Sequence, residues 1–244
     1  MCSSSWQLSK KNAIKRLKCG SIPSKANPEI QRIFFEEKLQ PLMEKAQVNE
    51  EVLLFVDASH FVMGCDFLGY AYGKVRHFVR THSGRKRYNV LAALNFATKK
   101  LTTVTNDTYI TATQVCELLR KLAVEYTGTI INLVLDNASY QKCQAVKDLA
   151  TKLRINLIFL PSHSPNLNLI ERAWKFVKVK LRTQYYSDFN LFIEKIDSVI
   201  NASDKEYKQD FDRLISNKVQ LYDNFSTVAE NSCACIPLPS SLAA

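Results

Sequence analysis

Two apolar runs, each followed directly by an aspartate, constrain the fold of this 244-residue chain most strongly. Residues 52–56 precede Asp57, and residues 130–135 precede Asp136. Short, nearly continuous apolar runs of this kind are typical of strands buried on both faces of a sheet. A carboxylate at the end of such a strand is costly unless it is paired or holds a cation. The two aspartates are therefore candidate functional residues.

The remaining periodicity predicts antiparallel strands first and alternating strands and helices afterwards. We expect further strands over residues 87–96, 100–105 and 155–160, a glycine-containing hairpin over 66–80, and helices over 111–126, 143–153, 166–182, 188–201 and 205–217. This order indicates an α/β domain with a mixed sheet and helices on both faces. It is compatible with a ribonuclease-H-like fold, although not unique to it.

A third carboxylate, Glu171, opens the last part of this pattern after the Pro-rich loop over residues 160–166. At 100° per residue it shares a helix stripe with three cations, Lys175, Lys178 and Arg182, and the neighbouring stripe is apolar. An ordinary solvated face with a Glu–Lys pair is one interpretation. The other is that Glu171 faces a metal while the cations hold a DNA backbone.

Paired with two metal ions, the three carboxylates suit phosphoryl transfer on nucleic acid. Two Mg²⁺ ions, or Mn²⁺, activate the attacking oxygen and stabilise the leaving one, and Mg²⁺ prefers hard oxygen ligands. We expect Asp57 to bridge the ions, and Asp136 and Glu171 to hold one each. The alternative is that each aspartate merely caps a turn at a strand end.

The charge distribution supports a polyanionic partner. Lys and Arg number 33 against 23 Asp and Glu, for a net charge of +10, and no acidic residue stands between Asp66 and Asp107. That interval contains Arg85, Lys86 and Arg87, which we expect to contact DNA. A merely basic protein is the alternative. His60 and His163 stand near the acidic residues and are candidate substrate contacts.

Other classes of protein find little support in the sequence. The chain has no glycine-rich nucleotide-binding motif. Its seven cysteines are scattered and include no C-x-x-C pair, which indicates reduced thiols and a cytoplasmic location. We expect no membrane segment, since no apolar run is long enough.

Four segments, residues 55–61, 89–95, 133–138 and 160–174, resemble mariner-type DDE transposases, most closely the bacterial insertion-sequence 630 family. The last segment is the most specific, and residues 137–170, 34 in all, separate Asp136 from Glu171 as in that branch. The resemblance covers roughly residues 50–200. His163 stands where an aromatic residue is commoner and Leu169 where proline is commoner.

The resemblance implies a ribonuclease-H-like core, divalent metal dependence, double-stranded DNA as substrate and cut-and-paste transposition. By position, Asp57, Asp136 and Glu171 match the catalytic triad of the family, and a homodimer on DNA is expected. We divide the chain into four parts. They are a basic arm (1–27) interpreted as a remnant of an N-terminal DNA-binding module, an amphipathic linker helix (28–50), the DDE catalytic domain (51–217) and a largely disordered tail (218–244).

Two alternatives stay open at this point. Only about 50 residues precede the first catalytic strand, so a split or truncated transposase is one hypothesis. In that case the chain is the catalytic half of the transposase. The competing interpretation is a catalytically silent DNA-binding remnant, or a partner subunit that joins a second polypeptide. The other alternative is a ribonuclease H or resolvase-like nuclease, which the segment around Glu171 matches poorly.

Overall fold

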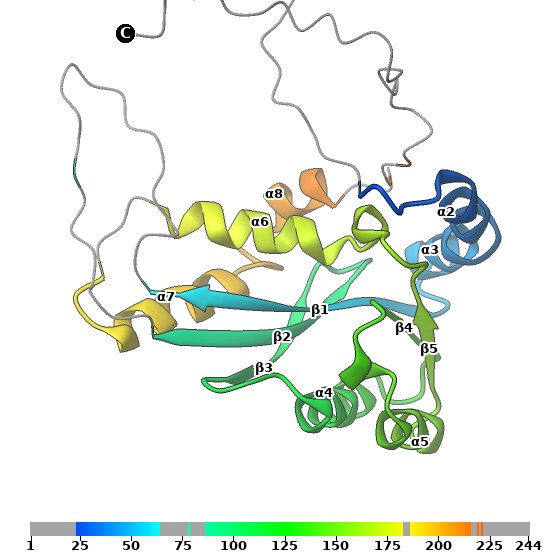
Figure 1. The fold of residues 1–244 in the computed structure, drawn as a ribbon, viewed down its shortest axis with the longest axis horizontal. Helices are drawn as coiled ribbons and strands as arrows, with labels where there is room; N and C mark the ends of the chain where they lie inside the picture. Colours follow the sequence, from blue (N-terminus) through cyan, green and yellow to red (C-terminus); the bar gives the residue numbers. More distant parts are fainter. Residues whose placement is uncertain are drawn as a thin grey trace, which may run out of the picture.

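The chain folds around one mixed sheet with helices on both faces, in a computed structural model that describes residues 23–63, 78, 86–182, 186–215, 219 and 221 (Figure 1). The five strands are β1 (Val52–Val62), β2 (Arg87–Asn95), β3 (Leu101–Asn106), β4 (Ile131–Leu135) and β5 (Ile155–Phe159). Their order is β3-β2-β1-β4-β5. The β1–β2 and β2–β3 pairs are antiparallel, whereas β1–β4 and β4–β5 are parallel. The predicted mixed sheet is confirmed.

Strand β1 is longer than predicted, because it continues past Asp57 to Val62. Its parallel pairing with β4 ends at Phe55, but its antiparallel pairing with β2 runs on, with Asp57 opposite Ala92. Beyond Asp57 the side chains alternate: Ser59 and Phe61 are buried while His60 is exposed. A strand with a partner on one side only keeps this alternation, so Asp57 lies within β1 rather than at its end.

Two apolar clusters cover the two faces of the sheet. One joins Phe55 and Phe61 to α6 (Ile170–Lys180), α7 (Phe189–Asn201) and α8 (Lys208–Leu214). The other joins Leu54 and Val56 to α4 (Ala112–Glu125) and α5 (Gln144–Lys152). Figure 1 shows α6 and α8 on one side of the sheet and α4 and α5 on the other. Alternate residues of β1 therefore enter different cores.

The segment before β1 packs on the first of these clusters. It is helical throughout, as α2 (Pro28–Phe34), a π-helical turn η1 (Phe35–Leu39) and α3 (Gln40–Gln47). Leu39, Met43 and Ala46 are buried in the same cluster as α6. The predicted helix over residues 28–50 is thus present but ends at Gln47, and it forms part of the core.

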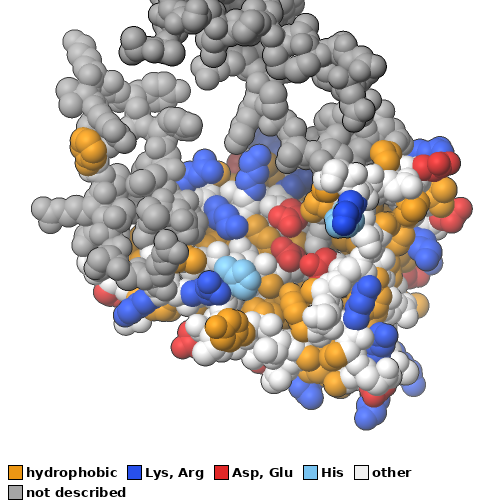
Figure 2. All heavy atoms as spheres, viewed as in Figure 1, with side chains coloured by type: hydrophobic (Ala, Val, Ile, Leu, Met, Phe, Trp, Pro, Cys, Tyr) orange, Lys and Arg blue, Asp and Glu red, His pale blue; other side chains and the backbone are white. Residues whose placement is uncertain are grey.

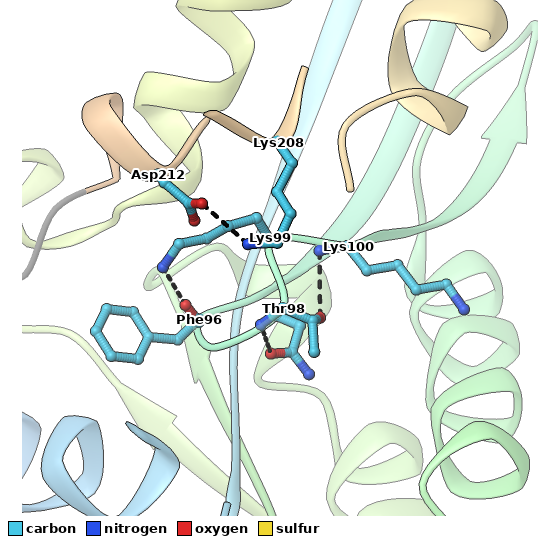
Figure 3. A network of polar contacts seen from close by, with 7 residues as sticks. Phe96, Thr98, Lys99, Lys100, Lys208 and Asp212 are labelled. Atoms are coloured by element: carbon cyan, nitrogen blue, oxygen red, sulfur yellow. Dashed lines mark hydrogen bonds and ion pairs between the residues drawn. The ribbon is translucent and has the colours of Figure 1, made fainter. Parts of the chain in front are cut away.

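The tight connection between β2 and β3 is built by side chains of its own (Figure 3). The Asn95 carboxamide oxygen accepts hydrogen bonds from the amides of Ala97 and Thr98, both at 2.9 Å. Lys99 adopts a left-handed φ of 63°, and its ammonium lies 4.5 Å from the centre of the Phe96 ring and donates to the Phe96 carbonyl. Burial lowers the pKa of Lys99. We read this corner as structural.

The helices within the described ranges are too short or too polar to cross a membrane. Cys116 and Cys143, which lie in those ranges, are free thiols. The predicted hairpin over 66–80, apart from Phe78, lies outside the described residues, as do most of the basic arm and the C-terminal tail.

Candidate active site

A cavity of about 370 Å³ lies where β1, β4, β5 and the start of α6 meet. Asp57, Asp136 and Glu171 all line it. Its other lining residues come from the turn after β4 and from the loop between β5 and α6: Asn137, Ala138, Leu160, Pro161, Ser162, His163, Ser164, Pro165 and Asn168. Three carboxylates that are 79 and 35 positions apart in the sequence are thus gathered around one hollow.

The parallel pairing of β1 and β4 places the two aspartates side by side. Phe55 pairs with Val134, so two residues further on Asp57 stands level with Asp136. Asp57 also shares a sheet face with Phe55, the face that α6 covers. The two carboxylates therefore meet at the end of β4 and face the helix that carries Glu171.

Glu171 sits in the first turn of α6, which begins at Ile170 rather than at residue 166 as predicted. Pro165–Leu167 forms a separate 3-10 turn and Asn168 is extended, with a ψ of 99°, so the helix cannot start before them. The predicted apolar stripe is confirmed, with all its members buried: Ile170, Ala173, Trp174, Val177 and Leu181. This stripe fixes the rotation of α6 and turns Glu171 toward the cavity.

Asp57 carries the largest electrostatic cost of the three. Burial, followed by the negative charges of Glu171 and Asp136, raises the pKa of its carboxyl to about 7. The Trp174 indole opposes this rise by donating from Nε1 to Oδ2 of Asp57 at 3.1 Å. Burial also raises the pKa of Glu171, with Lys178 acting in the other direction and Asp136 in the same one.

Asp136 takes part in a turn as well as in the cavity. Its Oδ1 accepts from the amide of Ala138 at 3.2 Å, and the neighbouring Asn137 donates from Nδ2 to the Leu160 carbonyl at 2.6 Å. The turn-capping interpretation therefore holds for one oxygen of Asp136. Burial, followed by the charges of Asp136 and Asp57, raises the pKa of nearby Tyr140 to about 12.

The donor set suits a hard divalent cation. The raised pKa of Asp57 shows that its negative charge lacks compensation, and a bound cation would supply it. Throughout the described ranges, however, no three His, Cys, Asp or Glu side chains converge on a single point as they stand. Carboxylates that repel one another are expected to stay apart until a cation draws them together.

Of the residues predicted to contact substrate or DNA, some line the cavity and others lie outside it. His163 lines the cavity, with a left-handed φ of 59°. His60 instead contacts Asn89, with 2.6 Å between its Nδ1 and the Asn89 Oδ1. The exposed Lys86 and Arg87 line a second hollow, with Phe189, and Arg85 lies outside the described residues. On α6, Lys175 is exposed and Lys178 is partly buried, and Arg182, which follows the end of α6, is exposed.

Cationic side chains border the acidic ones on this face of the molecule. Figure 2 shows Asp and Glu side chains gathered near its middle, with Lys, Arg and His side chains around them. A phosphate backbone would be attracted to such a border, while the acidic centre would repel it unless a cation intervened.

Sequence reasoning missed three residues that shape the cavity. It placed Trp174 in the core, which is correct, but not as the donor to Asp57. It did not find Asn168, whose Nδ2 donates to the Val56 carbonyl at 3.1 Å. Nor did it find Gln31, which contacts the loop before α6 from α2. An amide side chain in an otherwise apolar helix stripe is the signal that could have indicated Gln31.

Comparison with known proteins agrees with this geometry. The sequence model of the DDE superfamily endonuclease family matches residues 52–193, more than half of the chain. No curated protein matches the chain in sequence.

Three solved structures show a similar fold. The Mos1 strand transfer complex has a TM-score of 0.61 at 13% identity, over 87% of this chain and 66% of that chain. The Mos1 mariner paired end complex with Mn gives 0.62 at 12%, over 87% and 66%. The catalytic domain of the Mos1 mariner transposase gives 0.54 at 13%, over 80% and 93%.

The predicted ribonuclease-H-like fold is thereby confirmed. This chain spans just under two thirds of the protein chain in the strand transfer complex. The sequence match, the strand order and the cavity with its three carboxylates lead to the same assignment: the chain belongs to the DDE superfamily endonucleases.

Proposed function

We propose that this chain is the catalytic domain of a transposase that cuts double-stranded DNA and joins the cut strand to a target, in the cut-and-paste transposition of an insertion sequence. The observation that carries the proposal is that Asp57, Asp136 and Glu171, from β1, the end of β4 and α6, line one cavity. The resemblance of residues 160–174 supports a place near the insertion-sequence 630 family.

In this proposal the three carboxylates are the catalytic residues and the metal ligands. Asp57, Asp136 and Glu171 would together hold two Mg²⁺ or Mn²⁺ ions at the cavity that they line. When bound, such ions activate the attacking oxygen and stabilise the leaving oxygen of the phosphodiester. The Mos1 paired end complexes with Mn and with Mg are consistent with divalent ions in this fold.

The protein side chains orient this chemistry. The Trp174 indole donates to one oxygen of Asp57, and the backbone of Ala58 also hydrogen-bonds to this carboxylate, which lines the cavity. Asn168 ties the loop before Glu171 to the backbone of β1 at Val56. The contacts of Trp174 and Asn168 join α6 and its loop to the strand that carries Asp57, and Asp136 directly follows the neighbouring strand β4. Sites built in this way are held more accurately than sites on loops alone.

The DNA backbone would lie across the cations around the cavity. These are Lys175 and Lys178 on α6 and Arg182 just after it, together with Arg87 at the start of β2 and Arg85 and Lys86 before it in the sequence. His163 would contact substrate at the cavity wall, whereas the hydrogen bond between His60 and Asn89 makes His60 a weaker candidate. Two DNA ends must be brought together in transposition, so we propose a homodimer on DNA, working in the cytoplasm.

The experiment that tests this function is Mn²⁺-dependent nicking and strand transfer on supercoiled DNA. Wild type is compared with Glu171→Gln and with the matched control Glu117→Gln, an exposed glutamate of α4 paired with Lys121. We expect activity in wild type and in the control, and its loss in Glu171→Gln. Equal nicking by all three proteins would contradict the assignment.

A DNA-binding protein that does not cut is the second candidate. It is favoured by the observation that, among the described residues, no three ligating side chains converge on one point. The same assay separates the two candidates. Tight DNA binding without Mn²⁺-dependent nicking by wild type would favour the second candidate.

A further inference from the structure

Helix α2 carries one buried polar side chain, Gln31, which is 1% exposed. Both ends of its amide contact the loop between β5 and α6. Its Nε2 donates to the His163 carbonyl at 3.3 Å, and its Oε1 accepts from Nδ2 of Asn166 at 2.9 Å. A fully buried amide is retained at little cost only when its polar atoms are bonded. Gln31 therefore links α2 to the loop before α6.

That loop forms most of the cavity wall and leads directly into Glu171. It is held on one side by Asn168, which donates to the carbonyl of Val56, the residue before Asp57. It is held on the other side by Gln31. Figure 1 shows α2 beside the yellow-green segment that leads into α6.

The backbone of this loop needs such support. His163 has a φ of 59°, in the left-handed region that residues with a Cβ adopt rarely. Such conformations persist where the surroundings determine them, and they gather at functional sites. The carbonyl that Gln31 contacts belongs to His163 itself.

We propose that Gln31 is a positioning residue of the active site, which holds the loop so that His163 faces the cavity and the first turn of α6 places Glu171 beside it. The inference rests on the proposed function, because it assigns a catalytic consequence to a contact. It extends the site beyond residues 52–193, the part that matches the family model. The helix before the first catalytic strand is thus a component of the active site and not only a linker.

The test uses Gln31→Met, which keeps the length of the side chain and removes both hydrogen bonds. The matched control is Gln40→Met in α3, where the exposed Gln40 donates to Glu44 at 3.0 Å. If Gln31→Met does not fold, Gln31→Asn replaces it, since the shorter amide introduces no charge and cannot keep both contacts with the loop.

The first readout is amide hydrogen exchange in the metal-free protein, which needs no activity. The amides of Leu167 and Asn168 donate to Ser164 and Pro165 at 3.1 and 3.0 Å and report on the loop. We expect their exchange to accelerate at least tenfold in the Gln31 variant, with β1 and β4 unchanged, and to stay at the wild-type rate in Gln40→Met. Unchanged loop exchange would overturn the inference.

The second readout is Mn²⁺-dependent strand cleavage, with kcat and KM separated. We expect kcat to fall at least tenfold while KM for DNA changes less than twofold, because the cationic border is untouched. Faster loop exchange with unaltered kcat would also overturn the inference. A wild-type protein that cleaves no DNA would refute the proposed function and leave the exchange result to decide whether Gln31 holds the loop.

Discussion

Asp57→Asn should make the metal-free protein more stable at pH 8, although it removes a carboxylate that we propose to be catalytic. Asp57 is partly buried against α6 and lies within the fields of Glu171 and Asp136, which together raise its pKa to about 7. Asparagine is nearly isosteric and carries no charge. Its amide oxygen can still accept the hydrogen bond from Trp174, so the packing around residue 57 is expected to stay the same.

The magnitude follows from the pKa of Asp57. A rise from the ordinary value of 3.8 to about 7 corresponds to at most about 4 kcal/mol, at about 1.4 kcal/mol per pKa unit. Between these two values the folded state holds a proton that the unfolded state has lost, so wild-type stability falls as pH rises from 4 to 7 and levels off above 7. The Asn variant lacks this loss, and the two proteins should converge in stability below pH 4.

The measurement is urea unfolding followed by circular dichroism at several pH values in EDTA. Circular dichroism is preferable to fluorescence here, because Trp174 contacts residue 57 directly. The control is Asp148→Asn, an exposed aspartate of α5 that accepts from Gln144 at 2.7 Å. We expect the free energy of unfolding of Asp57→Asn to exceed that of wild type by about 2–4 kcal/mol at pH 8, and the control to differ by less than about 0.5 kcal/mol.

Divalent ions should reverse the comparison at pH 8. A ligand that binds only the folded state stabilises it by mass action, so Mg²⁺ or Mn²⁺ should stabilise wild type and leave Asp57→Asn nearly unaffected. A variant that is equally or less stable than wild type in EDTA at pH 8 would refute the reasoning. It would mean that the charge of Asp57 is already compensated within the protein.

Three further predictions concern the remaining parts of the site and the fold. Asp136→Asn should abolish cleavage and leave nonspecific DNA affinity equal or higher, because a repulsive charge is removed. Fluorescence anisotropy in EDTA measures the DNA affinity. A loss of affinity in parallel with the loss of cleavage would mean that Asp136 has a structural role. Replacing Lys175 and Lys178 together by Ala should reduce the slope of log affinity against log salt concentration by the contribution of about two phosphate contacts. DNA affinities measured at increasing NaCl concentrations give this slope, with Lys147→Ala on α5 as the control. Thr111→Ala should cost about 1 kcal/mol in urea unfolding, since Thr111 caps α4 together with Gln114, whereas Thr151→Ala near the end of α5 should cost less.

The architecture was largely predictable from the sequence, because it depends on patterns that local physics produces. The buried runs of β1 and β2 and the 3.6-residue stripe of α6 each favour one kind of element. The capping threonine at residue 111 fixes where α4 begins. The same patterns brought the three carboxylates toward one region, because strand ends of parallel neighbours lie at one edge of a sheet.

What could not be predicted depends on partners far apart in the sequence. The extension of β1 beyond Asp57 is set by its antiparallel partner β2, and no local pattern shows which strand supplies that partner. The late start of α6 follows from Asn168, whose side chain bonds to Val56, 112 positions away. Gln31 contacts residues 132 and 135 positions away. Apolar packing can be predicted without knowing which residues touch, because apolar contacts are non-directional. A hydrogen bond can be predicted only when its particular partner is known.

The electrostatic cost of folding is concentrated at the active-site cavity and not in the apolar cores. The two cores are apolar and closed, and the polar groups that they bury are mostly bonded, as in the amides of Asn89 and Asn132. The main electrostatic cost lies at Asp57, where three carboxylates share one cavity. A chain selected for stability alone would not keep three acids there, because the charges of Glu171 and Asp136 raise the cost of ionising Asp57. The cavity is therefore better explained by a cation that it has to bind than by the fold that surrounds it.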